Sequence, residues 1–309
     1  MKDYSEFSLW TRFWHQPIRA ERLATTRILL ALALLTDQLF QYLPFLSLFF
    51  GPDGVAPEGT YDQWVLSRWG WTILIFNTDN MAIVQTFFWS WVGVTVLFLV
   101  GWQTRLMNVW VWFLTLCFIN RNPSLCNYAD DAAAVLIFLL LFMPTGRAFS
   151  LDAYLRRRTY SADNLAPPMT SAWPVRVLQI QLSMIYFTTG LAKLVPSAWD
   201  GTWWDGTSLH YVLNDTTMGR WSYAQLPLPF WFTALLTYII VWWEALFIPL
   251  VIFKYTRYWA LIFGILLHIG IYVTLDVGWF SWYMIAFYGA WIPDSFWKKW
   301  SPYRTTSGV

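Results

Sequence analysis

The sequence predicts an all-α protein, built as a polytopic bundle of transmembrane helices. Three observations predict this class: 57% of the 309 residues are hydrophobic, only 12% are charged, and long apolar runs recur along the chain. A soluble domain carries about 25% charged residues, so this chain has too few charges for a surface that faces water. The net charge is only +2 and no basic block is present. We therefore expect the lipid bilayer as a partner and no nucleic acid.

The lengths of the apolar runs predict the helices. About 20 helical residues cross the hydrocarbon core of a bilayer. We expect about eight spans, near 23–46, 82–100, 106–120, 132–145, 173–193, 229–253, 257–275 and 278–293. Ahead of them, Phe7 to Arg22 carries tryptophans among basic residues, which is typical of an interfacial helix. The predicted organisation is an interfacial segment (1–22), a transmembrane domain (23–293) and a cytoplasmic tail (294–309).

The basic residues predict the orientation. With the N-terminus in the cytoplasm, 16 of the 20 Lys and Arg residues fall on the inner side. The remaining four are Arg68, Arg121, Lys193 and Arg220. Because cytoplasmic loops are rich in Lys and Arg, we expect both termini to be cytoplasmic. An odd number of spans would move the basic pair Lys298-Lys299 to the outside, so the charges also favour eight.

Polar residues inside the spans are the candidate functional groups, because they are costly in lipid. Gln179, Ser183, Tyr186, Gly190 and Lys193 recur at spacings of 4, 3, 4 and 3 residues. This spacing puts them on one face of a helix, which is predicted to face the bundle interior or a cavity. A second line of residues at a spacing of 4 follows later in the chain: Gly264, His268, Tyr272 and Asp276.

Each ionisable residue in a span also has a structural interpretation. A lysine at a helix end can extend to the lipid headgroups, and a histidine can be a hydrogen-bond partner between helices. Asp37 and Glu244 can form structural pairs with Arg or Tyr groups, or be neutral. Periodicity alone leaves these alternatives open.

Two stretches of the chain resemble a known family. The segment Tyr186 to Leu194 (YFTTGLAKL), followed by Trp199, Gly201 and Gly206 to Tyr211 (GTSLHY), resembles the corresponding part of vitamin K-dependent gamma-glutamyl carboxylase and its bacterial relatives, the HTTM (horizontally transferred transmembrane) family. A second family pattern is matched by Thr256-Arg257, His268, Gly278, Phe280 and Met284. The resemblance extends over about residues 20 to 293.

The resemblance implies an activity and a set of site residues. Lys193 falls on the lysine that those carboxylases use to deprotonate vitamin K hydroquinone, so Lys193 and His268 are the expected catalytic residues. The expected substrate or quinol cavity comprises Tyr186, Gly190, Trp199, Asn127, Asp130, Glu244 and Tyr272. The implied cofactor is vitamin K or menaquinone hydroquinone, and no metal is expected. The loop before the fourth span departs from the carboxylase pattern, because Cys126-Asn127-Tyr128 contains no histidine.

The expected protein is thus a quinol-dependent, carboxylase-like lyase or oxidoreductase of the bacterial inner membrane, with its functional face in the periplasm. Its expected substrate is a small quinol or another small acidic molecule. The alternative is a non-enzymatic membrane protein that keeps the fold and uses the cavity for a lipid, a peptide or a partner subunit. A transporter is less favoured, because no pair of interrupted helices recurs in two halves of the sequence.

Overall fold

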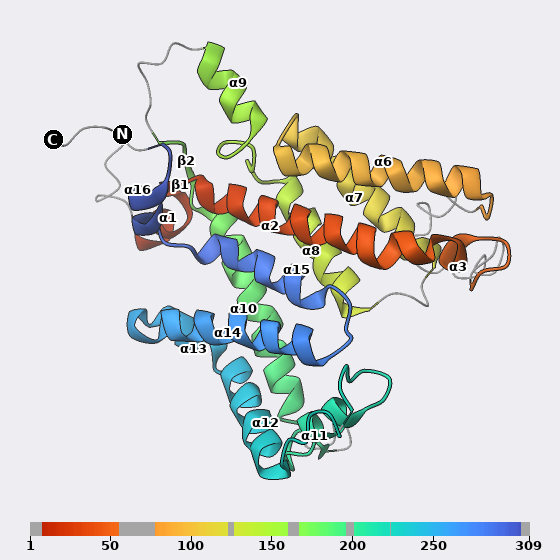
Figure 1. Ribbon diagram of the computed structural model, residues 1–309. Coiled ribbons are helices and arrows are strands. Elements are labelled where there is room, and N and C mark those ends of the chain that lie inside the picture. The colour runs from red at the N-terminus through yellow and green to blue at the C-terminus, as the bar shows by residue number, and fades with distance from the viewer. Residues whose placement is uncertain are drawn as a thin grey trace. The chain divides into compact units, whose positions relative to one another are not determined.

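The computed structural model describes residues 8–55, 78–122, 127–159, 167–195, 201–222 and 224–303. Helices dominate these residues, and their regular β structure is limited to one two-stranded ribbon, so the predicted all-α class is confirmed. The chain divides into two compact units (Figure 1). The first comprises Met1–Leu178 and Ala286–Val309, and the second comprises Gln179–Ile285.

The first unit contains most of the helices and the ribbon. In chain order its elements are α1 (Leu9–His15), β1 (Pro17–Arg19), α2 (Glu21–Asp37), η1 (Gln38–Tyr42), η2 (Leu43–Phe45), α3 (Leu46–Phe50), α6 (Met81–Val100), α7 (Thr104–Arg121), α8 (Tyr128–Leu141), α9 (Leu151–Thr159), β2 (Met169–Ser171), η5 (Tyr288–Trp291) and α16 (Asp294–Trp300). Two helices, α10 (Trp173–Lys193) and α15 (Phe280–Phe287), pass from one unit to the other.

The predicted interfacial helix over residues 7–22 is wrong in its extent. Helix α1 ends at His15, and Pro17 opens strand β1, which pairs antiparallel with β2. Proline has no N–H to continue a helix, and it disfavours helical conformation at the residue before it. Gln16 is accordingly extended, with ψ of 142°. Leu9 and Trp10 of the short helix remain exposed.

The first predicted span is present as a continuous but irregular helical segment. After α2, the chain passes through the π-helical turn η1 and the 3-10 turn η2 before it resumes as α3. Pro44 lies in η2. A proline inside a helix cannot donate to the carbonyl four residues earlier, and its ring crowds that carbonyl. The change from α-helix to π and 3-10 turns accommodates the Pro44 ring, and the helical segment as a whole extends from Glu21 to Phe50.

The core of the first unit is aromatic. Helix α2 packs against α6 and α8, while α7 packs against both α6 and α8 (Figure 1). The rings of Trp91 and Phe118 stack with their centroids 4.7 Å apart, and Phe50 meets Phe118 edge to face. One polar pair lies buried in this core: the Gln38 side-chain amide donates to the Thr95 hydroxyl at 3.0 Å. Such interhelical hydrogen bonds supplement the packing of small and large side chains in membrane bundles.

The second unit comprises most of α10, then α11 (Ser208–Asn214), α12 (Phe230–Ala245), α13 (Phe247–Ile252), α14 (Lys254–Thr274) and the start of α15. Helices α11 and α12 lie side by side (Figure 1). The span predicted over 229–253 consists of two helices, because the helix is interrupted at Leu246, and its crossing of the membrane stays a prediction. Pro249 explains the interruption, since it cannot donate to the carbonyl of Ala245, four residues earlier.

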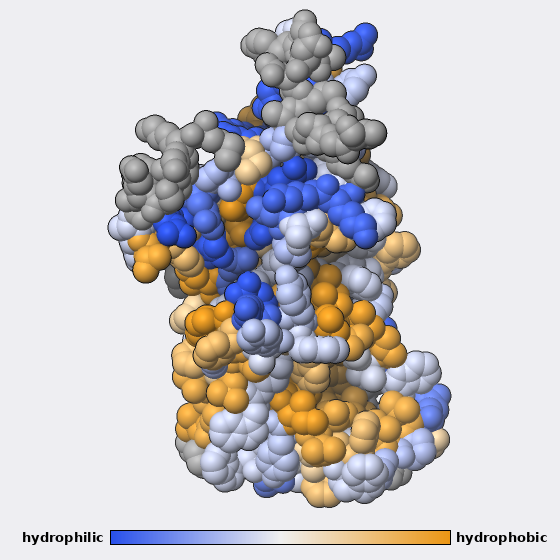
Figure 2. Space-filling model, turned by 90° about the vertical axis from the view of Figure 1, so that its left-hand side faces the viewer, coloured by the Kyte–Doolittle hydropathy of each residue, from blue (hydrophilic) through white to orange (hydrophobic). Residues whose placement is uncertain are grey.

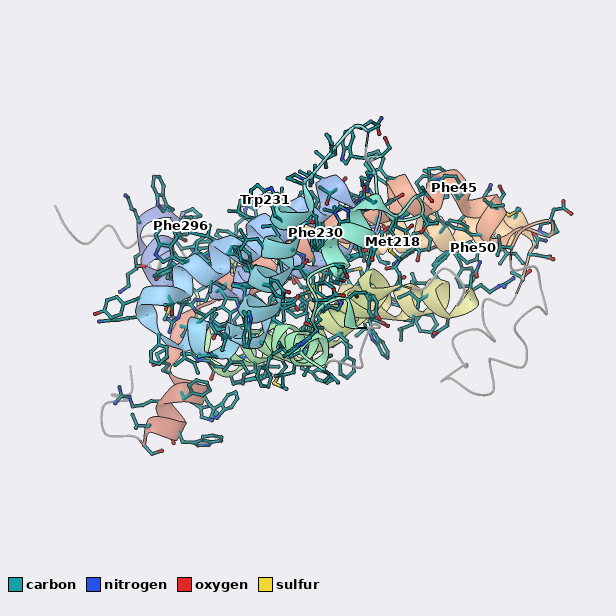
Figure 3. The ribbon with its side chains drawn as sticks, turned by 90° about the horizontal axis from the view of Figure 1, so that it is seen from below. Phe45, Phe50, Met218, Phe230, Trp231 and Phe296 are labelled. Atoms are coloured by element: carbon teal, nitrogen blue, oxygen red, sulfur yellow. The ribbon has the colours of Figure 1, made fainter. Side chains whose placement is uncertain are left out.

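The surface suits a lipid environment. Within the described residues, three helical segments are long and apolar enough to cross a membrane: Glu21–Phe50, Met81–Val100 and Lys254–Thr274. Helix α12 is apolar but shorter. Hydrophobic residues cover large areas of the face shown in Figure 2. Phe45, Phe230 and Trp231 are exposed, whereas Phe50 is fully buried (Figure 3). Exposed apolar side chains of this number carry no penalty when lipid tails cover them. The chain is therefore a helical membrane protein.

Candidate functional site

The polar stripe of α10 is buried. Gln179, Ser183, Tyr186 and Gly190 are all buried, whereas Ile180 on the other face is exposed. The predicted sidedness of this helix is therefore confirmed. The hydroxyl of Ser183 donates to the Gln179 carbonyl of the preceding turn at 2.8 Å, so its polarity is satisfied within the helix.

Gly190 sets the distance between α10 and α12. A Cβ atom at this position would lie 2.3 Å from the backbone nitrogen of Ala245 and 2.7 Å from the carbonyl carbon of Glu244. Only a residue without a side chain allows two helix backbones to approach so closely. Lys193 lies three residues after Gly190, on the same face of α10. The close contact thus brings Lys193 beside the C-terminal end of α12.

Lys193 and Glu244 form an ion pair. The Lys193 Nζ atom donates to Glu244 Oε2 at 2.6 Å, and the two side chains are only 16% and 9% exposed. The same Nζ atom lies 4.5 Å from the centroid of the Trp203 ring, in a cation–π contact. Charge-assisted hydrogen bonds of this length are the strong ones in proteins. Lys193 is therefore held between a carboxylate and an aromatic face.

A second polar pair lies deeper in the same unit. The Tyr186 hydroxyl and the Nε2 atom of His268 in α14 are 2.7 Å apart. His268 is 2% exposed, and its Nδ1 atom has no hydrogen-bond partner among the described residues. The rings of Trp243 and Phe247 each lie 4.7 Å from the Tyr186 ring. This pair is thus enclosed by aromatic side chains.

The two pairs share one helix. Tyr186 and Lys193 are seven residues apart on α10, which corresponds to about 10 Å along the helix axis. Their side chains bring an amine, a carboxylate, a phenol and an imidazole into one part of the second unit. Groups of these types hold and transfer protons. Among the described residues no cluster of His, Cys, Asp or Glu could hold a metal ion.

Asn127 and Asp130 form a capping box at the start of α8 in the first unit. Asn127 Oδ1 accepts from the backbone N–H of Ala129 at 2.7 Å, and Asp130 Oδ2 accepts from the backbone N–H of Asn127 at 2.9 Å. Tyr42 donates to the other oxygen of Asp130 at 3.4 Å. These interactions complete the N-terminus of a helix. A contact of either residue with a substrate stays a prediction.

Two further residues were predicted to line the cavity, Tyr272 and Trp199. The Tyr272 ring meets the rings of Trp279 and Trp282 edge to face, and the Arg220 guanidinium lies 5.4 Å from its ring centroid. The contacts seen for Tyr272 are thus with residues other than the two polar pairs. Trp199 lies outside the described residues.

Sequence reasoning missed the pairings themselves. The sequence identifies Lys193 and Glu244 as polar residues in spans, but it predicts an Arg or Tyr group as the structural partner of Glu244. Arg27 was counted as a basic residue at the cytoplasmic end of a span. The structure buries it completely, and its guanidinium donates to the carbonyls of Thr145 and Phe149 at 2.9 and 2.5 Å. The residues that pair with Arg27 and with Glu244 lie far from them along the chain, so no local pattern in the sequence indicates these contacts.

Comparisons with known proteins place the chain in a family. The model of the HTTM domain matches residues 60–295 of the chain. The chain is 24% identical over 219 residues to YitO, an uncharacterized protein of Bacillus subtilis (strain 168), and the match covers 67% of this chain. It covers 66% of YitO, so the chain spans just under two thirds of that relative's length. No solved structure matches the chain. The family model covers most of the chain, which therefore belongs to the HTTM domain family of membrane proteins.

Proposed function

We propose that this protein is a membrane-embedded, vitamin K-dependent carboxylase-like enzyme in which Lys193 deprotonates a hydroquinone. The observation that carries the proposal is the ion pair of Lys193 and Glu244, buried beside the face of Trp203. A lysine that serves as a base must lose its proton, and an acceptor 2.6 Å away supplies the route. The resemblance of the segment around Lys193 to the carboxylases points to the same residue.

Glu244 makes a neutral amine available at Lys193 for this reaction. In an apolar surrounding, transfer of the proton from the Lys193 ammonium to the Glu244 carboxylate replaces two charges by two neutral groups, which reduces the cost of burying them. The resulting amine at Lys193 Nζ accepts the proton of a hydroquinone O–H group. Glu244 is thus a positioning residue and a temporary proton carrier.

The side chains present fit a quinol. The ring of Trp203 offers an aromatic face next to Lys193 Nζ, and aromatic rings stack readily on such faces. When bound, a vitamin K or menaquinone hydroquinone would supply the oxygen-dependent redox chemistry that turns a weak base into a strong one. The chain itself would bind and orient the ring and receive its proton.

The Tyr186–His268 pair is proposed as the second catalytic element. The free Nδ1 position of His268 and its bond through Nε2 to Tyr186 form a short relay for a proton. The aromatic rings of Trp243 and Phe247 beside Tyr186 keep water away from it. Water exclusion strengthens the electrostatic interactions within such a site. This relay would take up and return a proton while Lys193 acts as the base.

The activity is tested in detergent-solubilised protein supplied with vitamin K hydroquinone or a menaquinone hydroquinone and oxygen. We expect the wild-type protein to consume the quinol, and Lys193→Arg to abolish turnover while quinol binding is retained, because arginine keeps the charge but cannot act as a neutral base. Lys254→Arg is the matched control, since Lys254 is an exposed lysine at the start of α14. Turnover by Lys193→Arg equal to the wild type would contradict the proposal.

The proposal includes a topology of about eight spans with both termini in the cytoplasm of a bacterium and the site facing the periplasm. The bacterial relative and the asymmetry of basic residues support it. Single cysteines at Asp215 and Arg158, in a background without the native cysteines, should react with an impermeant maleimide from opposite sides. Labelling of both from the same side of intact cells would exclude this orientation.

The closed ion pair also favours a second candidate, a non-enzymatic membrane protein that binds a lipid, a peptide or a partner subunit. Lys193 and Glu244 satisfy each other without any ligand, as a purely structural pair would. The two candidates differ in the quinol experiment. Wild-type protein that neither binds nor consumes any hydroquinone would favour the non-enzymatic one.

A further inference from the structure

A cavity of about 510 Å³ opens on the first unit, away from the residues assigned above. It lies where the connection from α6 to α7 meets the connection from α8 to α9. Its charged lining residues are Arg105, Arg147, Arg156 and Asp152, and its apolar lining includes Leu106 and Pro144. The lining therefore has three guanidinium groups and one carboxylate, and its net charge is positive.

The wall of the cavity is held in place by close packing. A Cβ atom on Gly146 would lie 2.5 Å from the Thr104 hydroxyl, so the loop before α9 touches the start of α7 directly. The Gly146 carbonyl accepts from the Ser150 hydroxyl at 2.8 Å and from the Arg156 guanidinium at 2.6 Å. The cavity is therefore a preformed feature of the first unit.

The single carboxylate in the lining is already occupied. Asp152 accepts from the backbone N–H groups of Gln103 and Thr104, each at 2.8 Å, and from the Thr104 hydroxyl at 2.7 Å. It caps the N-terminus of α7. None of the arginines in the lining forms an ion pair with a described residue. An anion that enters the cavity would thus meet three guanidinium groups whose charge no carboxylate contact offsets.

The arginines retain donors for a ligand. Arg156 and Arg147 each donate once, to the backbone carbonyls of Gly146 and Met169, and Arg105 makes no hydrogen bond to a described residue. A guanidinium has five N–H donors in a planar fork that fits phosphate oxygens. All three side chains are exposed. The shared chemistry of the site is therefore recognition of a phosphate group.

The cavity is continuous with an apolar surface. Leu106 lines it, and Leu106, Val109 and Trp110 are exposed at spacings of three and four residues, hence on one face of α7. A free phosphate has no apolar part that could contact this face of α7, whereas the acyl chains of a lipid would cover it. Basic pockets beside transmembrane helices are suited to anionic lipid headgroups.

We propose that the cavity binds the headgroup of an anionic phospholipid, whose phosphate contacts Arg105, Arg147 and Arg156 and whose acyl chains lie along the exposed face of α7. This site does not depend on the quinol activity proposed above. It would fix the first unit at the inner surface of the membrane, where the basic residues are predicted to lie.

The test is native mass spectrometry of the full chain in neutral detergent, titrated with phosphatidylglycerol or with phosphatidylcholine of the same acyl chains. We expect tighter binding of phosphatidylglycerol. Each arginine near an anionic lipid contributes a factor of about five in affinity, so R105Q combined with R156Q should weaken phosphatidylglycerol binding about 25-fold. R105K combined with R156K should recover most of the affinity, which separates charge from folding.

Arg158→Gln is the matched control, because Arg158 is exposed on the same helix, α9, but does not line the cavity. It should change the affinity by less than about twofold. Equal binding of the two lipids by the wild type, or an equal loss in Arg158→Gln, would overturn the proposal. Displacement of phosphatidylglycerol by inorganic phosphate at equal concentration would overturn it too, and would identify a phosphate site instead.

Discussion

Removal of one partner of the Lys193–Glu244 pair should destabilise the protein far more than removal of both. At an N···O distance of 2.6 Å, the Coulomb attraction is about 6 kcal/mol at an effective dielectric constant of about 20. The burial of two ions opposes this attraction by several kcal/mol each. Lys193→Met leaves the Glu244 carboxylate buried without its cation, and Glu244→Leu leaves the ammonium.

We therefore expect each single variant to lose about 3 kcal/mol of unfolding free energy, and the double variant to lie within about 1 kcal/mol of the wild type. The lower end of the usual range applies because both groups keep a little exposure, at 16% and 9%. The assay is unfolding of the purified protein in mixed micelles with increasing dodecyl sulfate, followed by circular dichroism. The four proteins form a double-mutant cycle that isolates the coupling.

Asp276→Asn provides the comparison. Arg220 and Asp276 also form an ion pair in the second unit, at 3.1 Å, but Asp276 is 64% exposed. Exposed pairs contribute about 0 to 1 kcal/mol, so this variant should differ little from the wild type. The reasoning is refuted if Lys193→Met costs no more than Asp276→Asn, or if the double variant is less stable than either single one.

Three further predictions concern local features. Gly190→Ala should destabilise the protein by more than about 2 kcal/mol in the same assay, since its Cβ atom would collide with the backbone of α12. Gly270→Ala should be neutral or slightly stabilising, because no atom of the described residues outside its own helix lies within 4 Å of its added Cβ atom. Asp152→Ala should cost about 1 to 2 kcal/mol in this assay through loss of the α7 cap; a value near zero would contradict the capping role. Hydrogen bonds from the Thr207 hydroxyl and backbone N–H lower the pKa of the exposed Asp205 carboxyl below its ordinary value of 3.8. The stability that these hydrogen bonds give to the turn should thus be complete above pH 3.8 and fall as the pH drops through the lowered pKa. Hydrogen exchange at the Thr207 amide measures this stability. Asp205→Asn should remove its pH dependence.

Much of the fold follows from local patterns in the sequence. The apolar runs near 82–100, 106–120 and 173–193 become helices with boundaries within a few residues of the prediction. The spacing of polar residues correctly identified the buried face of α10. Periodicity succeeds here because it depends on neighbouring residues of the same helix. The effects of Pro17, Pro44 and Pro249 are not predicted by these patterns, because a proline can end a helix, interrupt it or only change its local type.

Which polar groups meet depends on the tertiary packing. Lys193 and Glu244 are 51 residues apart, and Tyr186 and His268 are 82 residues apart. The pairing of Lys193 with Glu244 depends on how closely α10 approaches α12, which a single glycine at position 190 permits. The arginine-lined cavity likewise combines residues from two connections that are distant in the sequence. Periodicity along the chain thus identified the buried face of α10, whereas the packing of helix against helix fixed the partners of its polar side chains, because neighbours across a helix interface leave no periodic pattern in the sequence.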